Sequence, residues 1–231
     1  YVYCVGNPVK LIDPDGKKID LSNMSKQEKN RYTQQIKTER EASALFNTIY
    51  TTLENSEDTY TVKFGKVISN SSAGHDIDGN FTLNEEGGGT ILLTNQKEEI
   101  ASTALAEELF HAYQHENRNN YKKGEFNREF EAKTFVTAFG LEKGLGFGLF
   151  PAMGDFQEKI IGGTYEKGNQ VISPEAVVSN TFLTDYFRAA EKYAQYNTRN
   201  NYGSSNYRKH TTVKPYGLQR AILDTYRNQK K

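Results

Sequence analysis

Thr103-Ala-Leu-Ala-Glu-Glu-Leu-Phe-His-Ala-Tyr-Gln-His115 is the stretch from which the rest of the chain can be interpreted. Its apolar residues recur at helical spacing, which predicts an amphipathic helix. They are Leu105, Leu109, Ala112 and Tyr113. Glu107, His111 and His115 follow one another at intervals of four, so they lie one above the other on one face of that helix. Glu108 stands beside Glu107, three residues before His111.

This layout resembles the zinc-peptidase helix H-E-x-x-H, with Glu107 in place of the first histidine. Two ligands one turn apart can bind one cation, and the glutamate after the first ligand reaches the water on that cation. The metal lowers the pKa of the water, and the glutamate takes its proton. The resemblance therefore implies that Glu107 and His111 are metal ligands and that Glu108 is the general base.

A third ligand is expected from a second helical segment, Asn127-Arg-Glu-Phe-Glu-Ala-Lys-Thr-Phe135. Glu129 with Ala132 resembles the E-x-x-A/S pattern that supplies this ligand in glutamate-type zincins, and a small Ala132 would let two helices approach. Glu131 is the alternative ligand, but it lies about 200° round the helix from Glu129, so only one of the two can face the metal.

Alternatives remain open at this motif. His115 is a substitute ligand or a group that supports the site. The cofactor predicted from the resemblance is zinc, although a carboxylate ligand at Glu107 favours a harder divalent cation such as Mn²⁺. The non-functional explanation is a solvated helix face on which two histidines and several glutamates have no common ligand.

Residues 1–16, Y-V-Y-C-V-G-N-P-V-K-L-I-D-P-D-G, resemble the end of an Rhs/YD-repeat core, which reads roughly Y-x-Y-x-x-N-N-P-x-x-x-x-D-P-x-G. Gly6 stands where the first asparagine is usual. In that family a variable C-terminal effector domain follows this signature, often a toxin that is paired with an immunity protein. The resemblance implies a domain that is secreted or delivered from a bacterial cell as part of a larger protein.

The segment before the motif helix predicts one helix and several short strands. Apolar residues at helical spacing mark 43–53 as a helix, and 59–64 alternates as a strand. Further strands are expected at 67–69, 80–83 and 90–94, with turns at 74–79 and 85–89. Ligand-type residues in the first turn do not complete a calcium loop. Residues 90–94 are the expected edge strand, which would pair with an extended substrate.

Beyond the motif, a glycine-rich apolar loop is expected at 140–154, and helices at 181–196 and 217–226. The expected fold is α+β and zincin-like: a small, mainly antiparallel sheet packed on the active-site helix, followed by a mostly helical half. The chain would comprise the repeat end at 1–16 and an effector domain at 17–231, divided near 96.

Composition narrows the function. The chain has 231 residues, no net charge and one cysteine. It contains no run of about 18 apolar residues that would span a membrane. A balanced charge argues against a nucleic-acid partner for the whole chain, although residues 199–231 hold eight Lys/Arg and one acid.

We therefore expect a metal-dependent peptidase toxin domain that acts on a protein or peptide. One alternative is an inactive zincin-like module that only binds. The other is a nucleic-acid-directed toxin that uses the basic C-terminal segment.

Overall fold

The computed structural model describes residues 18–66, 79–85, 87–94, 102–117, 125–144, 177–199 and 214–230. Within these residues the chain is an α+β protein, as expected, with six helices and four strands. They are β1 (Ile19–Asp20), α2 (Lys26–Ala42), α3 (Ala44–Glu54), β2 (Tyr60–Gly65), β3 (Gly79–Leu83), β4 (Gly89–Thr94), α4 (Ser102–Glu116), α5 (Glu125–Glu142), α8 (Asn180–Arg199) and α9 (Tyr216–Gln229).

Two serines determine where the first helices begin. The Ser25 hydroxyl accepts the Glu28 amide while the Glu28 carboxylate accepts the Ser25 amide, a reciprocal capping box that starts α2. Ser43 has an extended backbone, so it ends α2, and its hydroxyl then accepts the Phe46 amide at the start of α3. The chain therefore changes direction at Ser43, and the apolar face of α3 is buried.

The sheet has the order β1-β2-β4-β3 and is mixed. β1 pairs with β2 and β2 with β4 in parallel, and only β3 with β4 is antiparallel. The prediction of a mainly antiparallel sheet was therefore wrong. The connection through α2 and α3 is a crossover that brings β2 back parallel to β1. β3 pairs with β4 on the side away from β2, so that β4 lies next to β2 and parallel to it.

The edge strand is also different from the expected one. β4, which covers 90–94, lies between β2 and β3, and its Ile91 and Leu93 are fully buried. An apolar run of this kind suits an interior strand. Among the described strands, β3 is the edge on the side of α4, and it contacts that helix.

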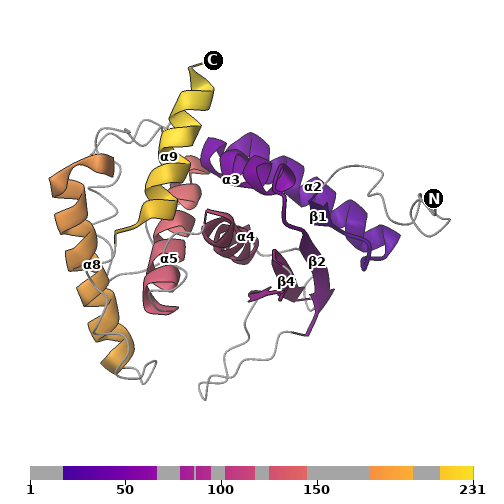
Figure 1. The fold of residues 1–231 in the computed structure, drawn as a ribbon, viewed down its shortest axis with the longest axis horizontal. Helices are drawn as coiled ribbons and strands as arrows, with labels where there is room; N and C mark the ends of the chain where they lie inside the picture. Colours follow the sequence, from indigo (N-terminus) through magenta and orange to yellow (C-terminus); the bar gives the residue numbers. More distant parts are fainter. Residues whose placement is uncertain are drawn as a thin grey trace, which may run out of the picture.

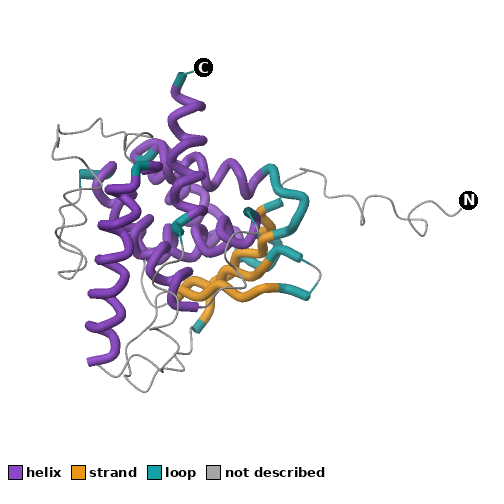
Figure 2. Tube along the Cα trace, turned by 60° about the vertical axis from the view of Figure 1, so that its left-hand side comes forward, coloured by secondary structure: helices purple, strands orange, loops and turns teal. Residues whose placement is uncertain are grey.

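Helix α4 lies at the centre of the molecule. Figure 1 shows the sheet on one side of it and α5, α9 and α8 on the other, with α2 and α3 alongside. Figure 2 shows the strands gathered together, apart from most of the helices. The buried residues of α4 include Leu105, Leu109 and Phe110. The ring of Phe110 stacks on Phe135 of α5, with centroids 4.3 Å apart. The motif helix is therefore the core element that both layers share.

Helix α5 runs antiparallel to α4, because Glu107 meets Lys133 whereas His111 meets Glu129. It continues through Gly140 to Glu142, so the first residues of the expected glycine-rich loop are helical; Gly144 then turns with φ of 72°. The expected helices at 181–196 and 217–226 correspond to α8 and α9. No helix in the described ranges is long and apolar enough to cross a membrane.

Several predictions fall outside the described residues. These are the signature at 1–16, the strand at 67–69, residues 74–78 of the first turn, the loop at 145–154 and the tyrosine-rich segment at 200–213.

Candidate metal centre

Helices α4 and α5 bring Glu107, His111 and Glu129 together. One ligand atom of each lies within 4.8 Å of the other two, so the group could hold a metal ion. The Nε2 atom of His111 is 3.4 Å from Oε1 of Glu129. Ala132 is completely buried, in keeping with its expected place between closely approaching helices. The four-residue spacing on α4 and the E-x-x-A pattern on α5 therefore point to the same place.

Glu108 lies beside this group and against the beginning of β3. A Cβ atom at Gly79 would be 2.6 Å from Cγ of Glu108, so glycine is needed there for the strand to approach the helix. Burial raises the pKa of Glu108 to about 7, with His111 opposing and Glu107 adding to the shift. In the metal-free protein, this carboxyl group can therefore exchange a proton near neutral pH.

The imidazole of His111 is oriented by a hydrogen bond to Gln114. Its Nδ1 atom is 3.0 Å from Oε1 of Gln114, and both residues are buried. Burial lowers the pKa of His111, but the carboxylates of Glu129 and Glu108 outweigh burial, and the net shift is upward. A histidine whose Nδ1 atom has a hydrogen-bond partner can present Nε2 to a cation, which is the usual arrangement of histidine ligands.

Lys133 is a part of the centre that the sequence reasoning missed. Its ammonium group forms an ion pair with Glu107. Burial lowers the pKa of Lys133, but Glu107 raises it more, so the lysine stays charged. The signal was present in the sequence, because Lys133 lies four residues after Glu129 and therefore on the same face of α5. Glu107 thus already has one cationic partner.

The side chains present fit a divalent cation. Glu107 and Glu129 supply two carboxylates beside the ammonium of Lys133, and Glu108 supplies a third when it is ionised. Negative charge is then in excess when His111 is neutral. Two carboxylates and one imidazole suit zinc and also harder ions such as Mn²⁺. An ion held by Glu107, His111 and Glu129 would share Glu107 with Lys133, and this lysine would then weaken its binding.

The two substitute ligands lie elsewhere. Glu131 is turned away from the group: Gln114 Nε2 donates to its Oε2 at 2.8 Å, and the Leu218 amide donates to its Oε1 at 2.8 Å. Burial raises the pKa of Glu131 to about 7, although the bond from Leu218 lowers it. The ring of His115 lies near Tyr60 and Phe81, and its Nδ1 is 3.3 Å from Tyr60 Oη. Neither residue belongs to the three-residue group.

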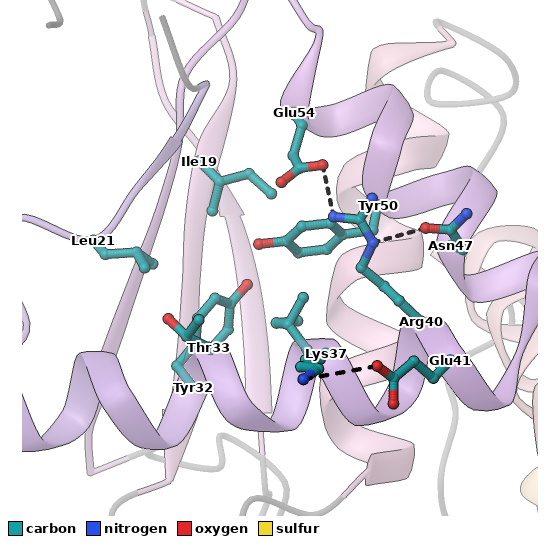
Figure 3. Close-up of a pocket in the computed structure, with 11 residues that line it drawn as sticks. Ile19, Leu21, Tyr32, Thr33, Lys37, Arg40, Glu41, Asn47, Tyr50 and Glu54 are labelled. Atoms are coloured by element: carbon teal, nitrogen blue, oxygen red, sulfur yellow. Dashed lines mark hydrogen bonds and ion pairs between the residues drawn. The ribbon is translucent and has the colours of Figure 1, made fainter. Parts of the chain in front are cut away.

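A separate cavity of about 500 Å³ lies between α2, α3 and the beginning of the sheet (Figure 3). Its charged groups are paired within its own wall. Arg40 donates to Glu54 at 2.8 Å and to Asn47 at 2.7 Å, and Lys37 is 4.0 Å from Glu41. None of the residues that line it belongs to the metal centre. The charged residues of this cavity are therefore paired with one another, and the cavity is separate from the carboxyl-rich group on α4 and α5.

The basic C-terminal segment is partly neutralised in the structure. Arg220 and Arg227 both lie near the carboxylate of Asp224, at 3.5 Å and 3.1 Å. These exposed pairs reduce the positive charge that α9 could present to a nucleic acid.

Comparisons of the chain with protein-family models, with curated proteins and with solved structures found no match.

Proposed function

We propose that the chain is a divalent-metal-dependent peptidase domain in which Glu107, His111 and Glu129 are the ligands and Glu108 is the general base. The observation that carries the proposal is the convergence of three ligand atoms within 4.8 Å on two antiparallel helices. Glu108 adjoins this group on α4, at the position that a proton acceptor takes in the resembling H-E-x-x-H helix.

The chemistry would be hydrolysis of an amide bond. The ion would supply an electrophile and lower the pKa of a water molecule. Glu108 would accept the proton from that water and later deliver it to the leaving nitrogen. His111 would be kept in place by Gln114, and Lys133 would offset part of the negative charge of the centre before metal binds.

The substrate would be an extended protein or peptide segment. β3 is the described edge strand beside α4, and it begins at Gly79 against Glu108. A peptide that adds to this edge by main-chain hydrogen bonds would pass the general base. The sequence had suggested β4 as the substrate-pairing edge strand, and we propose β3 instead.

The biological setting follows from the signature at 1–16. A domain that follows an Rhs-type repeat end would be a toxin delivered from a bacterial cell as part of a larger protein, and a cognate immunity protein would neutralise it. We also propose that the fold of this domain is zincin-like.

The ion pair of Lys133 with Glu107 favours one competing function, a binding module without catalysis. In that case the ammonium group would permanently take the place of the metal, and the edge of β3 would only bind a partner. The two functions differ in whether the protein contains a metal.

Metal analysis of protein purified without chelator tests the proposal. We expect close to one equivalent of zinc or manganese, removed by a chelator together with peptidase activity. The matched control is His111→Ala, which removes the imidazole ligand. Equal metal content in the two proteins, or none in either after reloading, would contradict the proposed site.

A further inference from the structure

A chain of buried hydrogen bonds runs from the metal centre to α9. His111 Nδ1 is 3.0 Å from Gln114 Oε1, and Gln114 Nε2 donates to Glu131 Oε2 at 2.8 Å. The other carboxylate oxygen, Oε1, accepts the amide of Leu218 in the first turn of α9. Gln114 and Glu131 are 1% and 2% exposed, so water does not compete for these bonds.

The chemistry of each group determines the direction of the chain. Above the pKa of Glu131, which is about 7, its ionised carboxylate only accepts hydrogen bonds, so the amide of Gln114 turns its NH₂ group toward Glu131. The same NH₂ group also donates to the main-chain oxygen of Arg128 at 3.2 Å. The amide oxygen of Gln114 therefore faces His111. It is the nearer of the two acceptors, 3.0 Å from Nδ1 against 3.4 Å between Nε2 and Glu129, so it favours a neutral imidazole with its proton on Nδ1. This tautomer leaves the lone pair of Nε2 directed toward Glu129, where a metal would bind.

Helix α9 completes the arrangement. A Cβ atom at Gly217 would lie 3.2 Å from Glu131 Oε1 and 3.5 Å from Gln114 Cγ. The first turn of α9 is therefore packed directly on the chain, and glycine lets it come this close. Without the Leu218 amide, one oxygen of a fully buried carboxylate would lose its donor.

We propose that Gln114 and Glu131 are positioning residues that hold His111 in its metal-binding tautomer, and that the docking of α9 on Glu131 keeps them in place. The inference rests on the proposed function for its metal readout, whereas its tautomer readout is independent of any metal. Gln114 and Glu131 act through His111 and do not themselves touch the ion.

Glu131→Gln is the decisive substitution because it changes one acceptor into a donor and keeps the shape. If the new amide oxygen accepts Leu218, its NH₂ group faces the NH₂ group of Gln114. Gln114 must then turn over, and its NH₂ group would face His111, so that the imidazole proton moves to Nε2. If the new oxygen faces Gln114 instead, the bond to α9 is lost.

Two measurements test this. Nitrogen-15 NMR of the imidazole, at about pH 9 where histidine is ordinarily neutral, reports which nitrogen carries the proton. We expect Nδ1–H in the wild type and a shift toward Nε2–H in Glu131→Gln. Titration with Mn²⁺ or Zn²⁺ should show affinity weakened about 10- to 100-fold, as is usual when the hydrogen-bond partner of a ligand is lost.

The exchange variant Gln114→Glu with Glu131→Gln provides the rescue. The carboxylate would then accept from His111 Nδ1 and from the new amide, whose oxygen would still accept Leu218. The composition and net charge are those of the wild type. We expect the Nδ1–H tautomer to return and most of the lost affinity to be recovered, with a remainder due to repulsion from the Arg128 carbonyl.

Glu142→Gln is the matched control. Glu142 is also a largely buried carboxylate on α5, and it accepts the Ser43 hydroxyl and the Leu45 amide at the first turn of α3. Its substitution should leave the tautomer and the affinity unchanged. Gln114→Met serves if Glu131→Gln does not fold, because it removes the acceptor of His111 and leaves the Glu131–Leu218 bond intact; it too should weaken binding and shift the tautomer.

The outcomes are distinguishable. An unchanged tautomer in Glu131→Gln and Gln114→Met, or an exchange variant no better than the single variant, would overturn the inference. Absence of metal binding by the wild type would overturn the proposed function instead, while the tautomer would still decide the inference.

Discussion

Two glutamate–lysine pairs contact α4, and they differ in the charged groups that surround them. Glu39 of α2 pairs with Lys143 just after α5, and Ser102 at the beginning of α4 donates to Glu39 at 2.6 Å. Glu39 is completely buried, and it is matched by one ammonium group. Glu107 pairs with Lys133 in the same way, but Glu108 and Glu129 adjoin it. The first pair is a balanced joint between three elements. The second has an excess of negative charge when Glu108 is ionised, and a cation would offset it.

Removing the proton acceptor of the second region is expected to have the largest effect. Glu108→Gln keeps the shape of the side chain but cannot take a proton, so peptidase activity or toxicity should fall by about 10²- to 10⁴-fold. The unfolding temperature should be retained, because a neutral amide is not penalised by burial. A variant as active as the wild type would show that any activity arises elsewhere on the chain.

Breaking the balanced joint should change stability alone. Lys143→Met leaves the carboxylate of Glu39 buried without its ammonium partner, which should lower the free energy of unfolding by about 3 kcal/mol. Urea denaturation measures this loss, and metal affinity should be unaffected. If Lys143→Met weakened metal binding without destabilising the fold, the two regions would not be independent.

The pH dependence of stability should reveal Glu142, next to the balanced joint. Burial raises the pKa of Glu142 to about 7 from its ordinary value of 4.5. A raised pKa means that its contribution is complete below about pH 4.5 and is lost as the pH rises to about 7. Glu142→Gln stays neutral, so the wild type should lose about 3 kcal/mol relative to it across this window.

Thermal unfolding of both proteins at closely spaced pH values measures this difference. Parallel curves would show that Glu142 is ionised throughout, held so by its bonds from Ser43 and Leu45.

Lys133→Met should have the smallest effect and tests the comparison most directly. Loss of the competing ammonium group should raise affinity for Mn²⁺ about tenfold, or about 1.4 kcal/mol. The metal-free variant should be less stable, because Glu107 loses its partner, and added metal should restore it. Calorimetric titration beside Lys143→Met measures the difference. Weaker binding in Lys133→Met would mean that the lysine supports the ion and does not compete with it.

The sequence predicted the local part of the architecture well. Helices α4 and α5 follow from spacings of three and four residues on single helices, whereas the pairing of His111 with Glu129 was expected from the resemblance to the zincin pattern. The direction of the strands was missed because it depends on a crossover through α2 and α3, whose path has no local signature. The edge position of β3 was missed because it depends on the order of the strands in the sheet, β1-β2-β4-β3, which no local pattern reports.

Side-chain partners distant in sequence were also beyond the pattern. Leu218 is 87 residues from Glu131. The spacing from Glu129 placed Lys133 on the correct face of α5, but its pairing with Glu107, 26 residues away, had no such signal. Glu131 is of a residue type that binds metal ions, yet its carboxylate accepts a hydrogen bond from the first turn of α9. Only the relative placement of α5 and α9 distinguishes these roles, and that placement comes from packing of the core.

The bond between Glu131 and Leu218 also has a consequence for timing. The ribosome adds roughly 5 to 20 residues per second, so the 87 residues between the two partners take roughly 4 to 17 seconds to make. During that interval the ligands already exist, but the amide that completes their support does not. A nascent chain would therefore pass through a period in which its centre lacks this support.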